Sequence, residues 1–129
     1  MSDGSLCVRV AGIEDSFKTH STSSRCYTYL GGLQNSAYNV FLPFPKTDAD
    51  NAALANVNGD QEAWIGCYNH DGNLYMHESN SQIVAPFWSN WAPGEDGLDE
   101  DKACFLTPDG KWSMATMNEK KRTLCAYRP

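Results

Sequence analysis

Five acidic side chains crowd into the seven residues from 95 to 101: Glu95, Asp96, Asp99, Glu100 and Asp101. Carboxylates this close repel one another, which raises their affinity for protons or recruits a cation that neutralises them. The run therefore predicts one of two structures. Either it holds a cation, with Glu95, Asp96, Asp99 and Asp101 as the candidate ligands, or it is a solvated acidic loop, which is the commoner fate of a charge run.

The histidines are the side chains that titrate near neutral pH, and one of them suggests a hydrolase site. His70 precedes Asp71, and Ser79 follows nearby. Neighbouring residues in a strand point to opposite faces, so adjacency in sequence does not make a catalytic triad. The sequence holds no metalloprotease helix, phosphate-binding glycine loop or nucleophile elbow. We therefore expect no enzymatic activity.

The composition is that of one globular domain, which we expect to span residues 1–129. Hydrophobic residues make up 41% and charged residues 20% of the chain. The formal net charge of −6 argues against a nucleic-acid partner, because that affinity comes mainly from Lys and Arg. No apolar run approaches the roughly 20 residues of a membrane helix, so we expect no membrane insertion.

We expect two helices to help position the candidate functional residues. The first is expected within Ser16–Leu30, and Gly31-Gly32 gives it a stop because glycine takes the left-handed C-terminal position without steric cost. Thr47 with Asp50 three residues later resembles a capping box, which predicts a second helix through about Val57.

The remaining elements are short strands separated by turns. Asp71-Gly72 and Pro108-Asp109-Gly110 are typical of hairpin turns. The long stretch from Glu78 to Asp101 has little regular pattern, and a loop of that length in a compact domain is usually functional or disordered. The predicted strands cover residues 6–10, 64–68, 74–77, 103–106, 111–114 and 122–127.

Aromatic, glycine and cysteine landmarks recur in a fixed order from residue 64 onwards. They are Trp64-Ile65-Gly66, Trp88-Ser89-Asn90-Trp91, Ala103-Cys104-Phe105, Gly110-Lys111-Trp112 and Leu124-Cys125-Ala126. Together with Cys26 and the diglycine, they make the chain resemble C-type lectin-like domains over nearly its whole length. The resemblance implies an α+β fold, with two helices packed on small antiparallel sheets and a long ligand-binding loop, here residues 78–101.

The resemblance also implies the disulfide frame. Cys26 and Cys125 match the family's end-to-end bond. The family's second bond needs a cysteine near Met117, where this chain has none. Cys67 is the expected substitute partner of Cys104, because both lie in short apolar strand segments that the family's fold brings into one sheet. Cys7 is left over, either as a buried free thiol or as a link to another chain in a homodimer.

Disulfides persist in oxidising compartments, so we expect an extracellular, secreted protein. Met1–Ser5 has neither the basic start nor the apolar run of a secretion signal. We therefore interpret Met1 as the start of a mature segment.

Sugar binding in the family commonly uses a calcium ion held by five side chains, of which this chain keeps Glu95. Asp96 and Gly97 occupy the positions where the family has Pro and Asn. Lys102 replaces a ligand Glu, and Ser113-Met114 replaces an Asn-Asp pair. Calcium takes six to eight hard oxygens. We therefore expect no required cofactor, and calcium only if the acidic run forms a shifted site.

The resemblance implies a non-catalytic module that binds a glycan or a protein through the long loop and the adjoining strand 111–114. Trp91 matches a family core residue. Two alternatives stay open: a calcium-dependent lectin with a shifted acidic site, and a structural protein that contacts mineral or ice. The expected ligand-binding residues are Phe87, Trp88, Asn90, Glu95, Asp96, Lys111 and Ser113.

Overall fold

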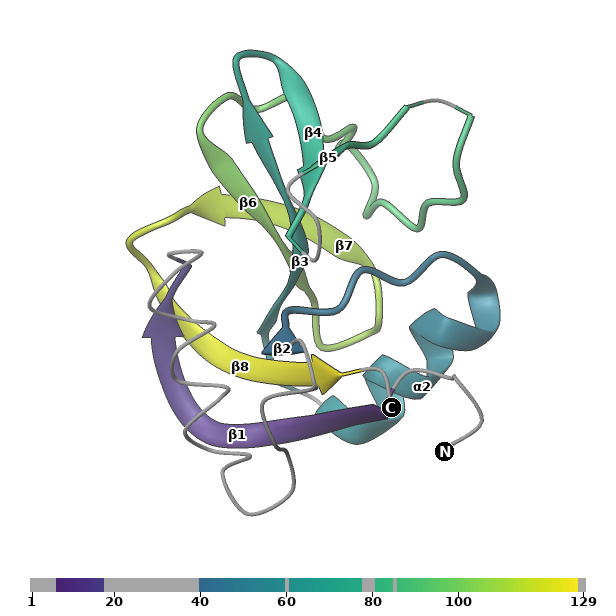
Figure 1. Cartoon of the computed structure of the whole chain (residues 1–129), viewed down its shortest axis with the longest axis vertical. Coiled ribbons are helices and arrows are strands. Elements are labelled where there is room, and N and C mark those ends of the chain that lie inside the picture. Colours follow the sequence, from purple (N-terminus) through teal and green to yellow (C-terminus); the bar gives the residue numbers. More distant parts are fainter. Residues whose placement is uncertain (1–6, 18–39, 60, 78–80, 85, 128–129) are drawn as a thin grey trace.

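The computed structural model describes residues 7–17, 40–59, 61–77, 81–84 and 86–127, shown in colour in Figure 1. No helix in these residues is long and apolar enough to cross a membrane. The elements in chain order are β1 (Cys7–Ser16), β2 (Val40–Phe41), α2 (Asp48–Asn58), β3 (Ala63–His70), β4 (Asn73–Met76), β5 (Ser81–Gln82), β6 (Lys102–Leu106), β7 (Trp112–Thr116) and β8 (Lys120–Tyr127).

The described strands form one hydrogen-bonded sheet, with a central path of β1-β8-β3-β4-β5. β2 pairs with β8, and β6 pairs with both β3 and β7. In Figure 1 the β1–β8 pair curves across the lower part, and the hairpins of β3, β4, β6 and β7 rise above it. The expected small antiparallel sheets are thus joined into one, because β3 and β8 pair in parallel at Ala63–Trp64.

Strand β3 is the middle of the core and is buried on both faces. Successive side chains of a strand point to opposite faces. Trp64 packs with Phe17 and Leu42 in one cluster, whereas Ile65 packs with Leu54 and other apolar side chains in the second. Each fully buried side chain of this kind stabilises the fold by about 1.5–3 kcal/mol.

Helix α2 begins and ends as the sequence predicts. Thr47 is its N-cap, and the Thr47 hydroxyl accepts a hydrogen bond from the backbone N–H of Asp50 at 3.1 Å. The capping box is incomplete, because the Asp50 carboxylate accepts from Lys46 N–H rather than from Thr47. Gly59, at φ 74°, ends the helix by donating to the carbonyl of Ala55.

Both predicted hairpin turns are present. Asp71 and Gly72 have φ values of 54° and 81° and join β3 to β4, as a two-residue hairpin with positive φ at both positions requires. Gly110, at φ 83°, closes the turn between β6 and β7. In this turn the Thr107 hydroxyl donates to Asp109 and holds the pKa of that exposed carboxyl below its usual range.

Several predicted boundaries differ from the structure, and one strand was not predicted. The opening strand continues to Ser16, so that residue belongs to β1, and Phe17 follows the strand in no regular element. Residues 18–30 of the predicted first helix lie outside the described residues. β4 ends at Met76, one residue before His77. A short strand, β5, lies inside the stretch that showed no regular pattern, and it pairs with β4 through Tyr75 and Gln82.

Candidate functional site

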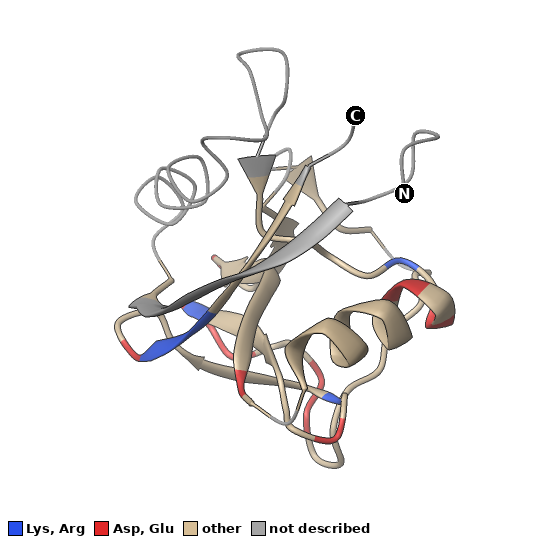
Figure 2. Cartoon of the chain, turned by 90° about the horizontal axis from the view of Figure 1, so that it is seen from below, with Lys and Arg blue, Asp and Glu red and all other residues tan. Residues whose placement is uncertain are grey.

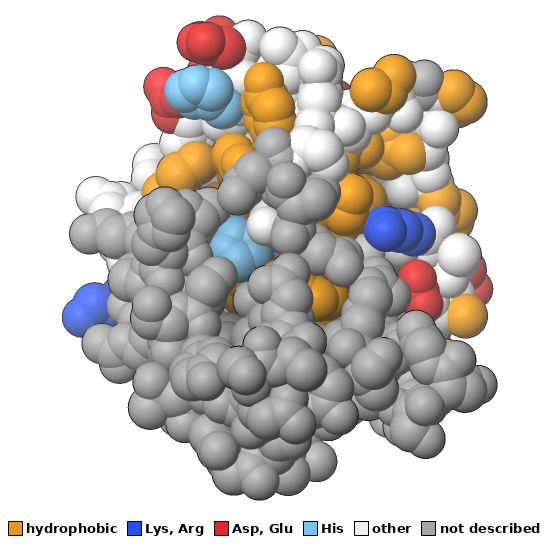
Figure 3. All heavy atoms as spheres, viewed as in Figure 1, with side chains coloured by type: hydrophobic (Ala, Val, Ile, Leu, Met, Phe, Trp, Pro, Cys, Tyr) orange, Lys and Arg blue, Asp and Glu red, His pale blue; other side chains and the backbone are white. Residues whose placement is uncertain are grey.

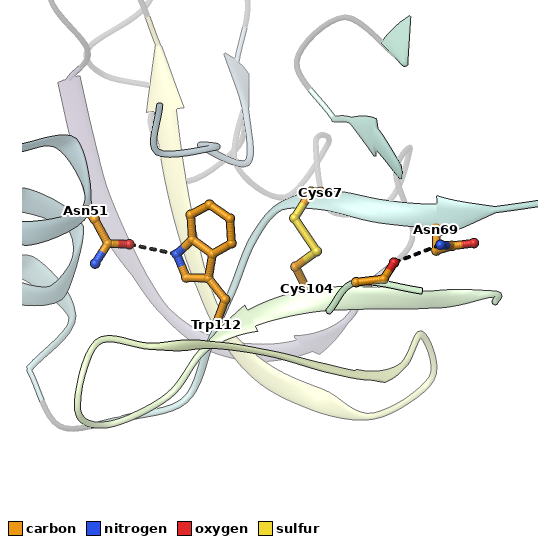
Figure 4. The surroundings of a disulfide bond; sticks show 6 residues. Asn51, Cys67, Asn69, Cys104 and Trp112 are labelled. Atoms are coloured by element: carbon orange, nitrogen blue, oxygen red, sulfur yellow. Dashed lines mark hydrogen bonds between the residues drawn. A yellow bond between two sulfur atoms is a disulfide. The ribbon is translucent and has the colours of Figure 1, made fainter. Parts of the chain in front are cut away.

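Trp112 on β7 is fully buried beneath the long loop. Its indole Nε1 donates a hydrogen bond to Asn51 Oδ1 on α2 at 2.7 Å (Figure 4). The rings of Phe44, Trp88 and Trp91 surround it, with centroids 5.4, 5.7 and 5.2 Å from the Trp112 centroid. Aromatic pairs at such distances contribute about 0.5–1.5 kcal/mol each beyond area burial. Two tryptophans of the loop are therefore anchored to the core.

The backbone of the loop is also bound to β7. The Trp112 N–H donates to the Asn90 carbonyl at 2.9 Å, and the Ala92 N–H donates to the Trp112 carbonyl at 2.8 Å. The Asn90 side chain also makes hydrogen bonds within the domain. Its Nδ2 donates to the Gly110 carbonyl, and its Oδ1 accepts from Lys111 Nζ at 3.4 Å. The structure thus places Asn90 as a residue that positions the loop beside the exposed Lys111.

Phe87 and Trp88 are both half-buried. Each packs one side against the core, Phe87 on Phe44 with centroids 6.4 Å apart and Trp88 on Trp112. Their remaining surface lines a groove of about 340 Å³. The residues that line it are Phe44, Lys46, Met76, Gln82, Ile83, Val84, Phe87 and Trp88.

Glu95 and Ser113 lie together at the other end of the loop. The Ser113 hydroxyl donates to Glu95 Oε2 at 2.9 Å, and both side chains are half-buried. The neighbouring Asp96 is exposed, and its Oδ1 accepts a hydrogen bond from the backbone N–H of Leu98. Glu95 is therefore tied to β7, whereas Asp96 shapes the turn of its own segment.

Gly97 is buried against Trp91 at φ 77°. A Cβ at this position would lie 2.6 Å from Trp91 Cζ2, closer than real side chains approach. Its carbonyl accepts a hydrogen bond from Asn69 Nδ2 at 2.9 Å (Figure 4). The loop requires glycine here both for the backbone conformation and for the space.

The acidic run follows directly and is exposed from Asp99 to Asp101. Lys102 makes an ion pair with Asp99, with 3.5 Å between Nζ and Oδ2. In the described part of the chain, no three His, Cys, Asp or Glu side chains converge as a metal site would require. The cation site at Glu95, Asp96, Asp99 and Asp101 stays a prediction.

The structure describes two of the histidines, His70 and His77. His70 is exposed at the β3–β4 turn, with its Nε2 3.8 Å from Asp71 Oδ2. His77 is buried, and its Nδ1 accepts a hydrogen bond from the backbone N–H of Leu42 at 3.0 Å. Ser79, the third residue of the suggested hydrolase site, lies outside the described residues.

The match to known proteins decides the family. The family model described as "Lectin C-type domain" matches residues 33–127. The chain belongs to the C-type lectin domain family. A search of curated proteins by sequence finds no match.

Solved C-type lectin structures share the fold at low sequence identity. The lectin CEL-I from Cucumaria echinata has a TM-score of 0.73 and 16% identity, and the match covers 98% of this chain and 92% of that one. Human lithostathine has a TM-score of 0.72 and 17% identity, with 100% and 91% covered. The C-type lectin domain of murine dendritic cell inhibitory receptor 2, solved with an N-glycan, has a TM-score of 0.70 and 13% identity, with 97% and 92% covered. These structures confirm the α+β fold.

The predicted disulfide between Cys67 and Cys104 is present in this C-type lectin domain. Cys67 on β3 and Cys104 on β6 are bonded, with Cα atoms 5.3 Å apart, between Trp112 and Asn69 (Figure 4). Cys125 is also disulfide-bonded. Cys26 and the side chain of Cys7 lie outside the described residues, so the bond from Cys26 to Cys125 stays a prediction.

The side chains at the family's usual calcium positions do not fit a calcium ion. The Glu95 carboxylate accepts a hydroxyl hydrogen from Ser113, and Gly97 has no side chain and a carbonyl already bound by Asn69. Lys102 brings an ammonium group, and the thioether of Met114 is buried. Calcium requires hard oxygen ligands, which these groups do not supply together.

Proposed function

We propose that this C-type lectin domain is an extracellular, secreted and non-catalytic recognition module, formed by residues 1–129 as one domain. It binds a glycan or a protein ligand through the long loop, about residues 78–101, and the adjoining strand β7. The residues assigned to binding are Phe87, Trp88, Asn90, Glu95, Asp96, Lys111 and Ser113.

The observation that carries this proposal is the half-burial of Phe87 and Trp88. One side of each ring is fixed against Phe44 or Trp112, and the rest of the ring lines the groove. A ring that is already immobilised loses little side-chain entropy when a ligand covers it. Aromatic side chains of this kind supply much of the contact energy in binding sites.

The polar residues around the rings supply orientation. Lys111 is exposed and can donate hydrogen bonds to a ligand, while Asn90 and Ser113 hold the loop to β7 and to Gly110. The murine receptor with a bound N-glycan supports a glycan as one ligand class.

The surroundings of the two described histidines support the non-catalytic assignment. His77 gives its Nδ1 lone pair to a backbone N–H, and His70 lies in a solvent-exposed turn. A link through Cys7 to a second copy would give a homodimer.

The test is the replacement of Trp88 by Ala, with Tyr75→Ala as the matched control. Tyr75 is also half-buried and packs on another ring, Tyr68, at 5.7 Å, but it lies on β4 outside the long loop. Trp88→Ala should weaken ligand binding at least tenfold, since truncating an aromatic anchor costs about 2 kcal/mol or more. Tyr75→Ala should leave binding within about twofold.

Melting curves of both variants separate binding from folding. If Trp88→Ala binds as tightly as the wild-type domain, the loop does not carry recognition. Collapse of its fold would show Trp88 to be a core residue and would remove it from the site.

A further inference from the structure

We propose that the groove between the long loop and the segment before α2 binds a small amphipathic carboxylate, meaning an apolar body of phenyl or short alkyl size that carries one acid group. Phe87 and Trp88 line this groove and also belong to the loop site proposed above, so the inference rests on that proposal and names a ligand class for the groove. The titration with small probes described below can fail while the Trp88→Ala binding test succeeds, so the two failures are distinguishable. The proposal rests on the juxtaposition of an apolar groove with a lysine that makes no ion pair to any residue the structure describes.

The groove is mainly apolar. Six of its eight lining residues are hydrophobic, and its volume of about 340 Å³ falls in the range of small-molecule sites. Phe44 forms a rigid wall, because it is buried and packs on both Trp112 and Phe87. Val84 lies at the rim with 71% of its surface exposed. A ligand that covers these surfaces gains about 25 cal/mol per Å² of apolar area removed from water.

The charge of the groove comes from Lys46, the one charged residue among those that line it. Its backbone N–H donates to Asp50 Oδ2 at 3.3 Å, which fixes the segment against the first turn of α2. No carboxylate of the described residues lies within ion-pairing distance of the Lys46 ammonium, although Asp48 and Asp50 belong to the same helix turn. An anionic group on the ligand would supply the missing partner.

Lys46 lines the groove together with six hydrophobic residues and precedes the acidic first turn of α2. Figure 2 shows a basic segment immediately before the acidic first turn of α2. In Figure 3 a basic side chain lies next to a group of hydrophobic side chains on the right of the molecule, with acidic side chains below it. The acidic start of α2 would repel an anion that approached from that side, so the carboxylate is directed to the Lys46 edge of the groove.

A neutral polar ligand fits less well. Gln82 is the other polar residue of the lining, and its Nε2 already donates to Asn73 Oδ1 at 3.2 Å. Several ligand hydroxyls would therefore lie against apolar walls without partners, which costs free energy for each. Within the loop site, the groove accordingly takes an apolar body with a single anionic end rather than the hydroxyl-rich part of a ligand.

The test is an NMR titration of the isotope-labelled domain with 3-phenylpropionate, and with 3-phenylpropanol and 3-phenylpropylamine as matched neutral and cationic probes. The largest shifts should fall on Lys46, Gln82, Ile83 and the Trp88 indole. The carboxylate should bind about two- to fivefold more tightly than the alcohol, as expected for one exposed ion pair, and the amine most weakly.

Two variants probe the charge without touching the core. Lys46→Met keeps the apolar stem and should make the carboxylate and the alcohol bind equally, whereas Lys120→Met removes an exposed lysine of β8 and should change nothing. Val84→Glu adds an anion at the exposed rim and should weaken the carboxylate more than the alcohol. Equal affinity of the three probes for the wild-type domain, shifts that map outside the groove, or an unchanged preference in Lys46→Met would each overturn the proposal.

Discussion

Ser113 on β7 donates its hydroxyl hydrogen to Glu95 in the long loop, with 2.9 Å between Oγ and Oε2. The two residues stand at positions that the family's calcium site uses. Here they contact each other directly, and Gly97 nearby is packed against Trp91. We infer that a hydrogen bond and aromatic packing hold this end of the loop where other members of the family use an ion.

Replacing Ser113 by Ala should lower the free energy of unfolding by about 1–2 kcal/mol, because the half-buried Glu95 carboxylate loses a hydrogen-bond donor. Urea denaturation of the variant measures this. Ser89→Ala, at an exposed loop position, is the control and should change stability by less than about 0.5 kcal/mol. Equal stability of the two variants would show that the Ser113–Glu95 bond does not hold the loop.

Alanine substitutions at Gly97 and Gly94 distinguish the stability cost of backbone strain from that of steric overlap. Both glycines have positive φ, 77° and 86°, but a Cβ at Gly94 would meet nothing within 4 Å. Gly94→Ala should cost about 1–2 kcal/mol for the left-handed backbone alone. Gly97→Ala should cost roughly a further 1–3 kcal/mol, because the added methyl overlaps Trp91. Chemical denaturation measures both, and similar losses would contradict the packing of Gly97 on Trp91.

Peptide mapping without reduction should recover Cys26 joined to Cys125, as the family's end-to-end bond requires. A loop of about 100 residues closed in this way is worth about 4–5 kcal/mol in the chain-entropy model. Recovery of Cys26 as a free thiol would contradict the pairing. The same map assigns Cys7 either as a free thiol or as a link between two chains.

Much of the fold could be predicted where the chemistry is local. Thr47 accepts from the N–H three residues later, Asp71-Gly72 supplies two positive φ values, and both patterns are readable in sequence. Helix α2 and the β3–β4 hairpin therefore appear where they were expected. Cys67–Cys104 followed from the family resemblance rather than from spacing.

The parts that could not be predicted depend on contacts between distant residues. Asn51 looks like an ordinary helix residue, yet it binds both Trp112 Nε1 and the Gly110 carbonyl about 60 positions away. Asn90 is predicted to bind a ligand, and no sequence pattern shows that its amide also contacts Gly110 and Lys111 within the fold. The groove joins Phe44 to Phe87 across two segments, and no local pattern relates them.

Millimolar calcium should shift the melting temperature little. Stabilisation by a bound ion grows with its concentration relative to the dissociation constant, and the usual ligands are replaced here. If the acidic run has formed a shifted site instead, the shift will be large, and Asp99→Asn with Asp101→Asn will abolish it. Such a mutation-sensitive shift would make the domain a calcium-dependent lectin with an acidic-loop site.

A glycan array probed with calcium and again with a chelator tests the central claim most directly, namely that the long loop recognises its ligand without the family's usual ion. The wild-type domain and the Trp88→Ala variant are compared under both conditions. The account predicts the same bound glycans, at similar strength, with and without calcium, and a clear loss of signal in Trp88→Ala. Binding that disappears with the chelator and is insensitive to Trp88→Ala would contradict it.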